Sequence, residues 1–349
     1  MKRALFLILI TVAVIGVMQD TNLAYSSNNA PVAIVSQSSG RVTVLNKSGA
    51  FLRGANRLTK IYPDEIIATA NGSSCTILFK DRSHVKLEAN SKVLISKVNV
   101  SANQRRGIGV LQGGVFVKVF NAGRGSSFSA FTPTAVAGVR GTEFRVSIAA
   151  DGSSQCQVVE GTVDFSSGQN SARCTAGTYG RHNTGEELQR GRSSGDLDAE
   201  DRNWQRNREQ QLARNPEAAM QNLDSDIKKI EQRNQQAMQK LQELRGTQVS
   251  RENAGQVAEL DGVVVENAAR SRAIRESSRN IARRHRNNPR VDRFDRSINQ
   301  SSSTIENQIN MMDKFIEQMG KQIDKLINQQ EGRIDNMMDN FMQRGFQRR

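Results

Sequence analysis

The chain has 349 residues, of which 37% are hydrophobic and 5% aromatic, with a single tryptophan at Trp204. This composition is too polar for one globule packed throughout, and it favours a folded half joined to an elongated, solvated half. The 49 lysines and arginines outnumber the 35 aspartates and glutamates, giving a net charge of +14. Such an excess is typical either of a protein with polyanionic partners or of a solvated basic surface without a specific partner.

Residues 1–26 have the features of a secretory signal peptide. Two basic residues precede an apolar run at 4–18, which is short for a stable membrane span, and small residues at Ala24 and Ser26 mark a cleavage site. We therefore expect an exported protein that is periplasmic, surface-associated or secreted, with an uncleaved signal anchor as the alternative. No other segment is apolar enough to span a bilayer.

Residues 32–178 are predicted to form strands. Apolar and polar residues alternate repeatedly between turns rich in Gly, Asn, Asp and Ser, as at 75–80, 114–119 and 143–148. Half-buried antiparallel strands with one solvated face give this pattern. We predict an all-β antiparallel domain that is solenoid-like or sandwich-like.

One stretch of this region, Phe131–Val146, reads FTPTAVAGVRGTEFRV. It resembles the "TP-x-A … vRGT-x-F-x-V" signature of the FecR domain family, and shorter family motifs occur in the family's order at 40–42, 62–69, 78–83, 111–114 and 159–163. The resemblance, over residues 32–178, implies a β domain in the periplasm or on the surface. The best-known members are sigma-factor regulators with a cytoplasmic segment before a membrane helix. Since only three residues precede the apolar run here, we do not expect that activity.

Five residues of the motif are assigned structural roles. Gly141 suits a sharp bend, Pro133 suits a turn, and Phe144 suits the core face of a strand. Arg140 is expected to be buried in the turn, where it would satisfy backbone carbonyls or a carboxylate rather than bind a ligand. The complete set comprises Pro133, Arg140, Gly141, Thr142 and Phe144.

The three cysteines predict one disulfide and one free thiol. Cys156 lies on a predicted strand and Cys174 lies just after the next one, so a hairpin would bring these two together, while Cys75 would stay a buried thiol. Neither the cysteines nor the three histidines have the spacing of metal ligands, and no phosphate-loop or dinucleotide motif is present. We expect no metal and no cofactor.

The rest of the chain is predicted to be a linker and a helical region. Residues 179–214 lose all periodicity and are predicted to be a flexible linker. From Asn215 a helix start is followed by an apolar seam with one polar member: Met220, Leu223, Ile227, Ile230, Asn234, Ala237, Leu241 and Leu244. Two further helical segments occupy 252–286 and the residues after Pro289, the latter with a slip in spacing between Ile298 and Ile309. These narrow stripes must pack on each other or on a second copy of the chain, within 215–349.

Arginines are concentrated in the second helical segment and just beyond it. Between Arg270 and Arg296 there are ten, against three acidic residues. Five recur at helical spacing and would line one stripe that a polyanion can contact: Arg272, Arg275, Arg279, Arg283 and Arg286. The alternative is a solvated helix face that counters acids on neighbouring helices.

These observations favour an exported cell-envelope binding or scaffolding protein that is not an enzyme. Its partners would be a protein or an anionic envelope polymer, with self-association through the helical tail. A nucleic-acid-binding protein acting through the arginine-rich helix is the alternative, although aromatic residues for base stacking are nearly absent there. An envelope enzyme acting on glycans is the second alternative, since carboxylates distant in sequence can meet in the fold.

Overall fold

The computed structural model describes residues 30–96, 105–120, 127–245 and 251–346, with the side chains of the last helix described as far as Met319. The predicted signal peptide at 1–26 lies outside the described residues. Among the helices in those ranges, none combines the length and the apolar character needed to cross a bilayer.

Two β-sheets share one long strand, β9 (Arg105–Lys118). The first sheet runs in the order β17 (Leu188–Arg192), β16 (Thr178–His182), β13 (Ser154–Glu160), β12 (Glu143–Ile148), β9, β7 (His84–Leu87), β6 (Ser74–Phe79), β1 (Ala33–Ser39) and β4 (Lys60–Ile61). The second runs in the order β3 (Phe51–Gly54), β2 (Val42–Leu45), β5 (Ile66–Thr69), β8 (Lys92–Ile95), β9, β10 (Ser127–Phe131), β11 (Val136–Val139), β14 (Thr162–Ser167) and β15 (Asn170–Thr175). Neither sheet closes on itself.

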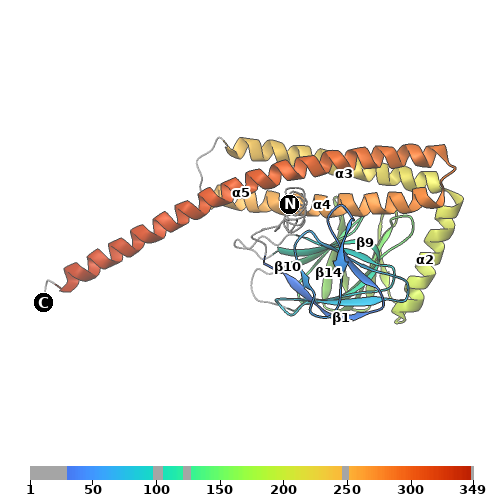
Figure 1. Ribbon diagram of the computed structural model, residues 1–349, viewed down its shortest axis with the longest axis horizontal. Helices are drawn as coiled ribbons and strands as arrows, with labels where there is room; N and C mark the ends of the chain where they lie inside the picture. The colour runs from blue at the N-terminus through green and yellow to red at the C-terminus, as the bar shows by residue number, and fades with distance from the viewer. Residues whose placement is uncertain (1–29, 97–104, 121–126, 246–250, 347–349) are drawn as a thin grey trace, which may run out of the picture. The chain divides into compact units, whose positions relative to one another are not determined.

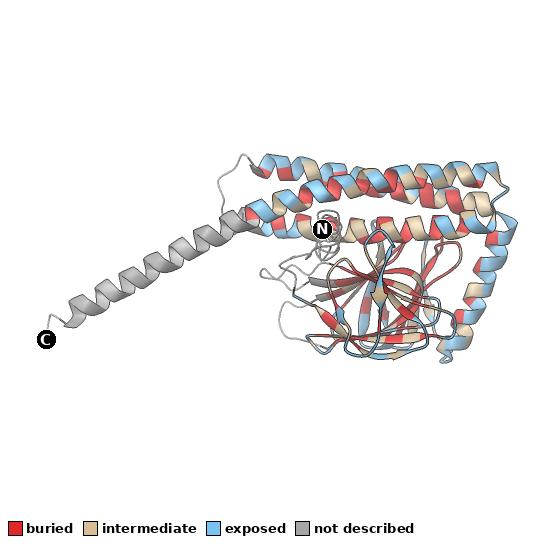
Figure 2. Cartoon of the chain, in the orientation of Figure 1, coloured by how far each residue is buried: buried red, intermediate tan, exposed pale blue. Residues whose placement is uncertain are grey.

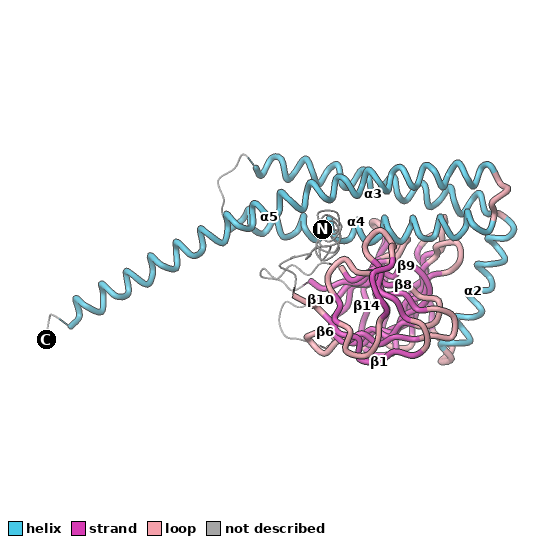
Figure 3. Tube along the Cα trace, in the orientation of Figure 1, coloured by secondary structure: helices cyan, strands magenta, loops and turns pink. Residues whose placement is uncertain are grey.

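The predicted all-β fold is confirmed, and it is a sandwich (Figure 3). Residues from both sheets form a single apolar core, with Ile77 and Val85 from the first and Val44 and Val93 from the second. The alternation seen in the sequence produces this core, because every second residue of a strand faces inward. In one respect the pairing differs from the expected antiparallel pattern, since β9 and β10 pair in parallel.

The strand β9 passes from one sheet to the other at a glycine pair. Its first half pairs with β8 and β10, and its second half pairs with β7 and β12. At the change of sheet Gly113 has φ +77°, and a Cβ there would lie 2.8 Å from Ser91 Cα and 2.9 Å from Asn90 O. A Cβ on Gly114 would collide with the Glu88 carboxylate. The corner therefore needs glycine at position 113, while a side chain at position 114 would have to displace the Glu88 carboxylate.

The FecR-like motif builds the turn between β11 and β12. Gly141 has φ +62°, and the Thr142 hydroxyl donates to Thr162 O at 2.8 Å, which ties the turn to β14. Pro133 and Phe144 are buried. Arg140 differs from the expectation: its side chain is exposed and has no partner among the described residues, because the Thr142 hydroxyl takes the stabilising role in the turn.

The range 179–214 does not have the flexible linker that its composition predicts. It contains the strands β16 and β17, which form one edge of the first sheet, and the helix α2 (Leu197–Arg214). The first turn of α2 is capped by Asp196, which accepts from Ala199 N at 2.9 Å. Composition was misleading here because α2 is held by charged groups rather than by an apolar stripe. Arg208 of α2 binds Asp151 at 2.6 Å, and Asp201 is 3.3 Å from Arg145 on β12.

Three longer helices, α3 (Pro216–Arg245), α4 (Arg251–Arg284) and α5 (Pro289–Phe346), pack on one another (Figure 1). The helix start predicted at Asn215 is confirmed, since its side chain accepts from Ala218 N at 3.1 Å. Every member of the predicted α3 seam is buried, and the buried positions of the three helices face each other (Figure 2). The seam is thus covered within one chain.

Polar residues occupy two layers of this bundle. Asn267 donates to Asn234 across α3 and α4 at 2.6 Å, with both side chains fully buried. Ser271 of α4 faces Ser302 of α5 at 3.2 Å, in the stretch between Ile298 and Ile309 where the sequence spacing slips. Small hydroxyl side chains therefore fill the place that a larger apolar residue would take.

All three cysteines are buried and unbridged in the structure, so the predicted Cys156–Cys174 disulfide is not formed in it. The two residues lie on strands of different sheets, which the hairpin interpretation did not anticipate. Cys156 pairs with Gly180, and the sulfur of Cys174 lies 3.1 Å from where a Cβ on Gly180 would be. Burial raises the pKa of both thiols, which disfavours the reactive thiolate.

The asparagine pair generates a stability prediction. Replacing Asn234 with Leu leaves Asn267 buried without its partner, so the single variant should lose about 1–3 kcal/mol of unfolding free energy. The double variant Asn234→Leu/Asn267→Leu removes both polar groups and should be as stable as the parent or more so. Urea unfolding followed by helical circular dichroism measures both, and a stable single variant would contradict the interaction.

The glycine corner generates a second prediction. Gly113→Ala should destabilise the sandwich by at least about 2 kcal/mol, because it adds both backbone strain and a steric clash. Gly168→Ala is the matched control, since Gly168 also has positive φ, at +60°, but has open space around it. Unfolding midpoints of the two variants that coincide would show that the contacts with Ser91 and Asn90 do not constrain the corner.

Candidate anion-binding pocket

The sandwich and the helices belong to one compact unit that begins at Pro31. Their contact runs along α4, which lies on the second sheet through small residues. Ala269 and Ala273 are fully buried against Ile66, Leu94 and Leu111. A Cβ on Gly109 of β9 would come within 3.3 Å of the Ala269 Cβ, so the helix backbone approaches the sheet closely.

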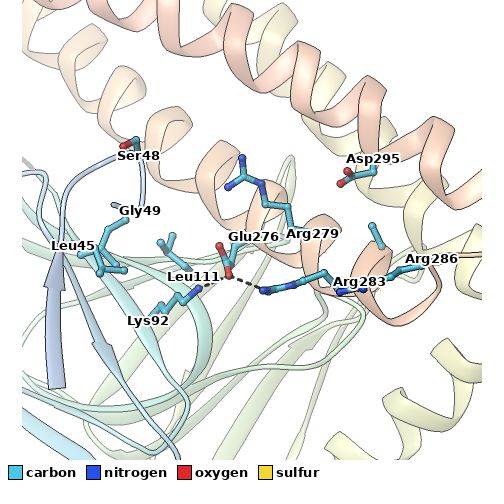
Figure 4. A pocket seen from close by; sticks show the side chains of 12 residues that line it. Leu45, Ser48, Gly49, Lys92, Leu111, Glu276, Arg279, Arg283, Arg286 and Asp295 are labelled. Carbon is cyan, nitrogen blue, oxygen red and sulfur yellow. Dashed lines mark hydrogen bonds and ion pairs between the residues drawn. The ribbon is translucent and has the colours of Figure 1, made fainter. Parts of the chain in front are cut away.

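Beside this contact lies a cavity of about 460 Å³ (Figure 4). The second sheet and the turn after β2 form one wall, α4 and the turn after it form the opposite wall, and the start of α5 contributes one residue. The apolar side chains of Leu45, Ile66 and Leu111 line it, together with a larger number of charged residues. The charged lining residues are Lys92, Glu276, Arg279, Arg283, Arg286 and Asp295.

Positive groups outnumber negative ones in this pocket. Glu276 is shared by two of them, at 2.6 Å from Lys92 and 3.9 Å from Arg283 (Figure 4). Arg279 and Arg286 are exposed and have no partner among the described residues. Asp295 accepts from Ser278 at 2.6 Å and from Asn299 at 3.1 Å, which occupies its oxygens. The pocket therefore offers unsatisfied guanidinium donors to an anion.

The structure divides the predicted arginine stripe into two parts. The inner pair, Arg272 and Arg275, is half-buried and lies 3.7 Å and 3.8 Å from Glu306 of α5. The outer three, Arg279, Arg283 and Arg286, line the pocket. The inner pair thus lies near an acid of a neighbouring helix, as one interpretation predicts, and contact of the outer three with a polyanion stays a prediction.

The neighbouring charges act on the inner pair. Burial lowers the pKa of the Arg275 guanidinium, and the positive charges of Arg279 and Arg272 lower it further, against the opposing effect of Glu306. Burial is the largest cause of this lowering, and the positive charges of the neighbouring arginines add to it. An anion in the pocket would meet the positive field of these arginines.

Sequence analysis missed Lys92, Glu276 and the apolar wall. Lys92 and Glu276 are 184 positions apart along the chain, and they meet only because α4 lies on the second sheet. Neither residue stands in a motif, so no local signal marks it. Within the described residues there is also no group of three His, Cys, Asp or Glu side chains placed to hold a metal ion.

Among known families, the one described as FecR protein matches residues 65–164. No curated protein matches the chain. Two crystal structures of a "putative anti-sigma factor" from Parabacteroides distasonis ATCC 8503, at 1.65 Å and 2.50 Å resolution, are similar to it. Each is 19% identical, with 38% of this chain and 62% of the other covered and TM-scores of 0.34 and 0.35.

This chain spans less than two thirds of the length of those solved structures, and similarity at this level establishes no shared partner. The family match is more informative, because it runs from β5 to β14 and includes the whole motif at Phe131–Val146. It confirms the resemblance inferred from that motif. Residues 65–164 of the sandwich match the family described as FecR protein.

Proposed function

We propose that this chain is an exported cell-envelope binding protein that holds an anionic polymer at the pocket between α4 and the second sheet. One observation carries the proposal. Lys92 from β8, Arg279 and Arg283 from α4, and Arg286 from the turn after α4 line one cavity, in which Glu276 pairs with Lys92 and Arg283.

The pocket chemistry indicates the class of ligand. Guanidinium groups bind phosphate and carboxylate oxygens through paired donors, and exposed positive groups in a row favour a ligand with repeated charges. The apolar wall formed by Leu45, Ile66 and Leu111 suits a polymer whose backbone or sugar rings carry nonpolar surface between the charges. Nucleic acid remains the alternative ligand, yet no aromatic residue lines the pocket to stack on a base.

Export is the second part of the proposal. The signal-like segment at 1–26 supports it, and the FecR match supports it further, since the resemblance implies a periplasmic or surface β domain. The polymer would then be one of the anionic components of the envelope. We propose binding without chemistry, since the pocket offers arginines and Lys92 while its two carboxylates, Glu276 and Asp295, already have partners.

The localisation has a direct test. Cell fractionation should place the protein outside the cytoplasm, and N-terminal sequencing of the mature chain should begin between Tyr25 and Pro31. A cytoplasmic chain that retains Met1 would contradict export and would favour the nucleic-acid alternative. A membrane-bound chain that retains Met1 would show the signal-anchor form instead.

Polymer binding is tested with polyphosphate chains as the probe and the full mature chain as the protein. The triple variant Arg279→Gln/Arg283→Gln/Arg286→Gln should bind polyphosphate at least about 30-fold more weakly and lower the salt slope of log K by roughly 2–3. The matched control, Arg140→Gln/Arg192→Gln/Arg202→Gln, removes the same charge from exposed positions outside the pocket and should bind like the parent.

A gain-of-binding variant makes the test sharper. Glu276→Gln keeps the shape of the side chain but releases Lys92 and Arg283 from their acid, so its affinity for polyphosphate should rise about 3- to 10-fold. Equal losses in the pocket and control triple variants would mean that net charge, not the pocket, binds the polymer. Tighter binding of single-stranded DNA than of polyphosphate, lost in the pocket variant, would favour nucleic acid.

A further inference from the structure

The hairpin formed by β2 and β3 ends beside the pocket and exposes two large apolar side chains. Phe51 is 66% exposed and Leu52 is 46% exposed. Among the described residues, they are the only exposed large hydrophobic residues that are consecutive in the chain. Such residues usually occur singly on a solvated surface, so an exposed pair indicates an interaction surface.

Phe51 lies next to the lining of the pocket. It is the register partner of Leu45 on β2, and cross-strand partners point to the same face of a sheet. Leu45 lines the pocket, and so do Ser48 and Gly49 of the turn between β2 and β3, on the wall opposite α4 (Figure 4). The exposed apolar pair therefore adjoins a cavity whose opposite wall carries exposed arginines.

A β-bulge in β3 lies at Leu52. Leu45 pairs with Phe51 and Val44 pairs with Arg53, so Leu52 has no partner on β2. Bulges of this kind re-aim a side chain and occur at sheet edges and beside binding sites. They also make an edge strand a poor template for an added strand, and β3 is only four residues long. An extended peptide that adds a strand is therefore the less suitable partner.

The chain around the apolar pair is positively charged. Residues 41–63 contain five lysines and arginines and no aspartate or glutamate. One of the five, Arg53, is held by Glu65 at 2.7 Å. The other four are exposed: Arg41, Lys47, Arg57 and Lys60. Exposed apolar side chains in a positive surround are complementary to a surface that is negative outside and apolar beneath, which is the surface of a bilayer with anionic lipids.

We propose that residues 46–52, which we call the hairpin tip, dock the protein on an anionic lipid bilayer. Phe51 and Leu52 enter the boundary between headgroups and acyl chains, and Lys47 supplies positive charge beside them. This surface goes beyond the anion pocket and does not depend on what the pocket binds. Because the turn of the hairpin forms part of the pocket wall, docking would hold the pocket at the membrane surface.

The experiment is co-sedimentation of the full mature chain with vesicles of mixed phosphatidylglycerol and phosphatidylcholine, and with vesicles of phosphatidylcholine alone. The parent should bind the mixed vesicles at least about 10-fold more tightly. Phe51→Ser/Leu52→Ser should weaken that binding at least about 30-fold, because two apolar side chains no longer leave water. Lys47→Gln should weaken it about 5-fold through the loss of one charge.

The matched control is Val159→Ser/Met311→Ser, which removes two exposed apolar side chains far from the hairpin in the sequence and should bind vesicles like the parent. Circular dichroism melts check that all variants stay folded. Polyphosphate binding separates this proposal from that for the pocket. Phe51→Ser/Leu52→Ser should bind polyphosphate like the parent, whereas the triple pocket variant should lose that binding.

Three results would overturn the docking proposal. One is a parent that binds neither kind of vesicle, or both equally, and another is a Phe51→Ser/Leu52→Ser variant that binds the mixed vesicles normally. The third comes from sedimentation velocity without lipid: a parent that self-associates through Phe51 and Leu52 would make the hairpin tip an interface between copies of the chain.

Discussion

The close approach of α4 to the second sheet is the contact on which most of the arrangement depends. Ala269 and Ala273 lie buried against the sheet, and Ala269 can come this close because a Cβ on Gly109 of β9 would lie only 3.3 Å from its Cβ. On its other side α4 buries Ile274 and Ile281 against α3 and α5. One helix therefore belongs to both the sandwich and the bundle. Its position also places Glu276 beside Lys92 in the lining of the pocket.

A polar attachment supports this apolar one from the opposite sheet. Along α2, Asp198 and Asp201 bind Arg145, Trp204 donates to Asn183 at 3.1 Å, and Arg208 binds Asp151 and Glu186. Arg145 and Arg208 are buried, and removing a partner from a buried charge costs several kcal/mol. Because α2 runs directly into α3, the bundle is tied to both sheets. The bundle thus contacts the first sheet through α2 and the second sheet through α4.

Periodicity predicted those parts of the fold in which apolar residues do the packing. The strand alternation around Ile77 and the seam from Met220 to Leu244 both became buried faces, because each depends only on local spacing and on water exclusion. Periodicity did not predict the segment α2, which is attached to the sandwich mainly by charged side chains. The α2 segment has too few apolar residues to resemble a docked helix, and its ion-pair partners lie dozens of residues away. The local sequence also does not show that Thr142, and not Arg140, stabilises the turn between β11 and β12.

The pocket residues invite a purely structural explanation, and it accounts for only some of them. Arg283 and Arg284 lie in the last turn of α4, where positive side chains stabilise a helix by about 0.3–1 kcal/mol through its dipole. That effect is confined to the last turn, so it does not apply to Arg279, which precedes it, or to Lys92, which lies on β8. Glu306 lies near Arg272 and Arg275, but the basic residues of the pocket have fewer acids beside them. Glu276 pairs with both Lys92 and Arg283. Without a ligand, the positive charge left in the pocket repels itself. An anion bound there would remove this repulsion, and this supports the binding that we propose.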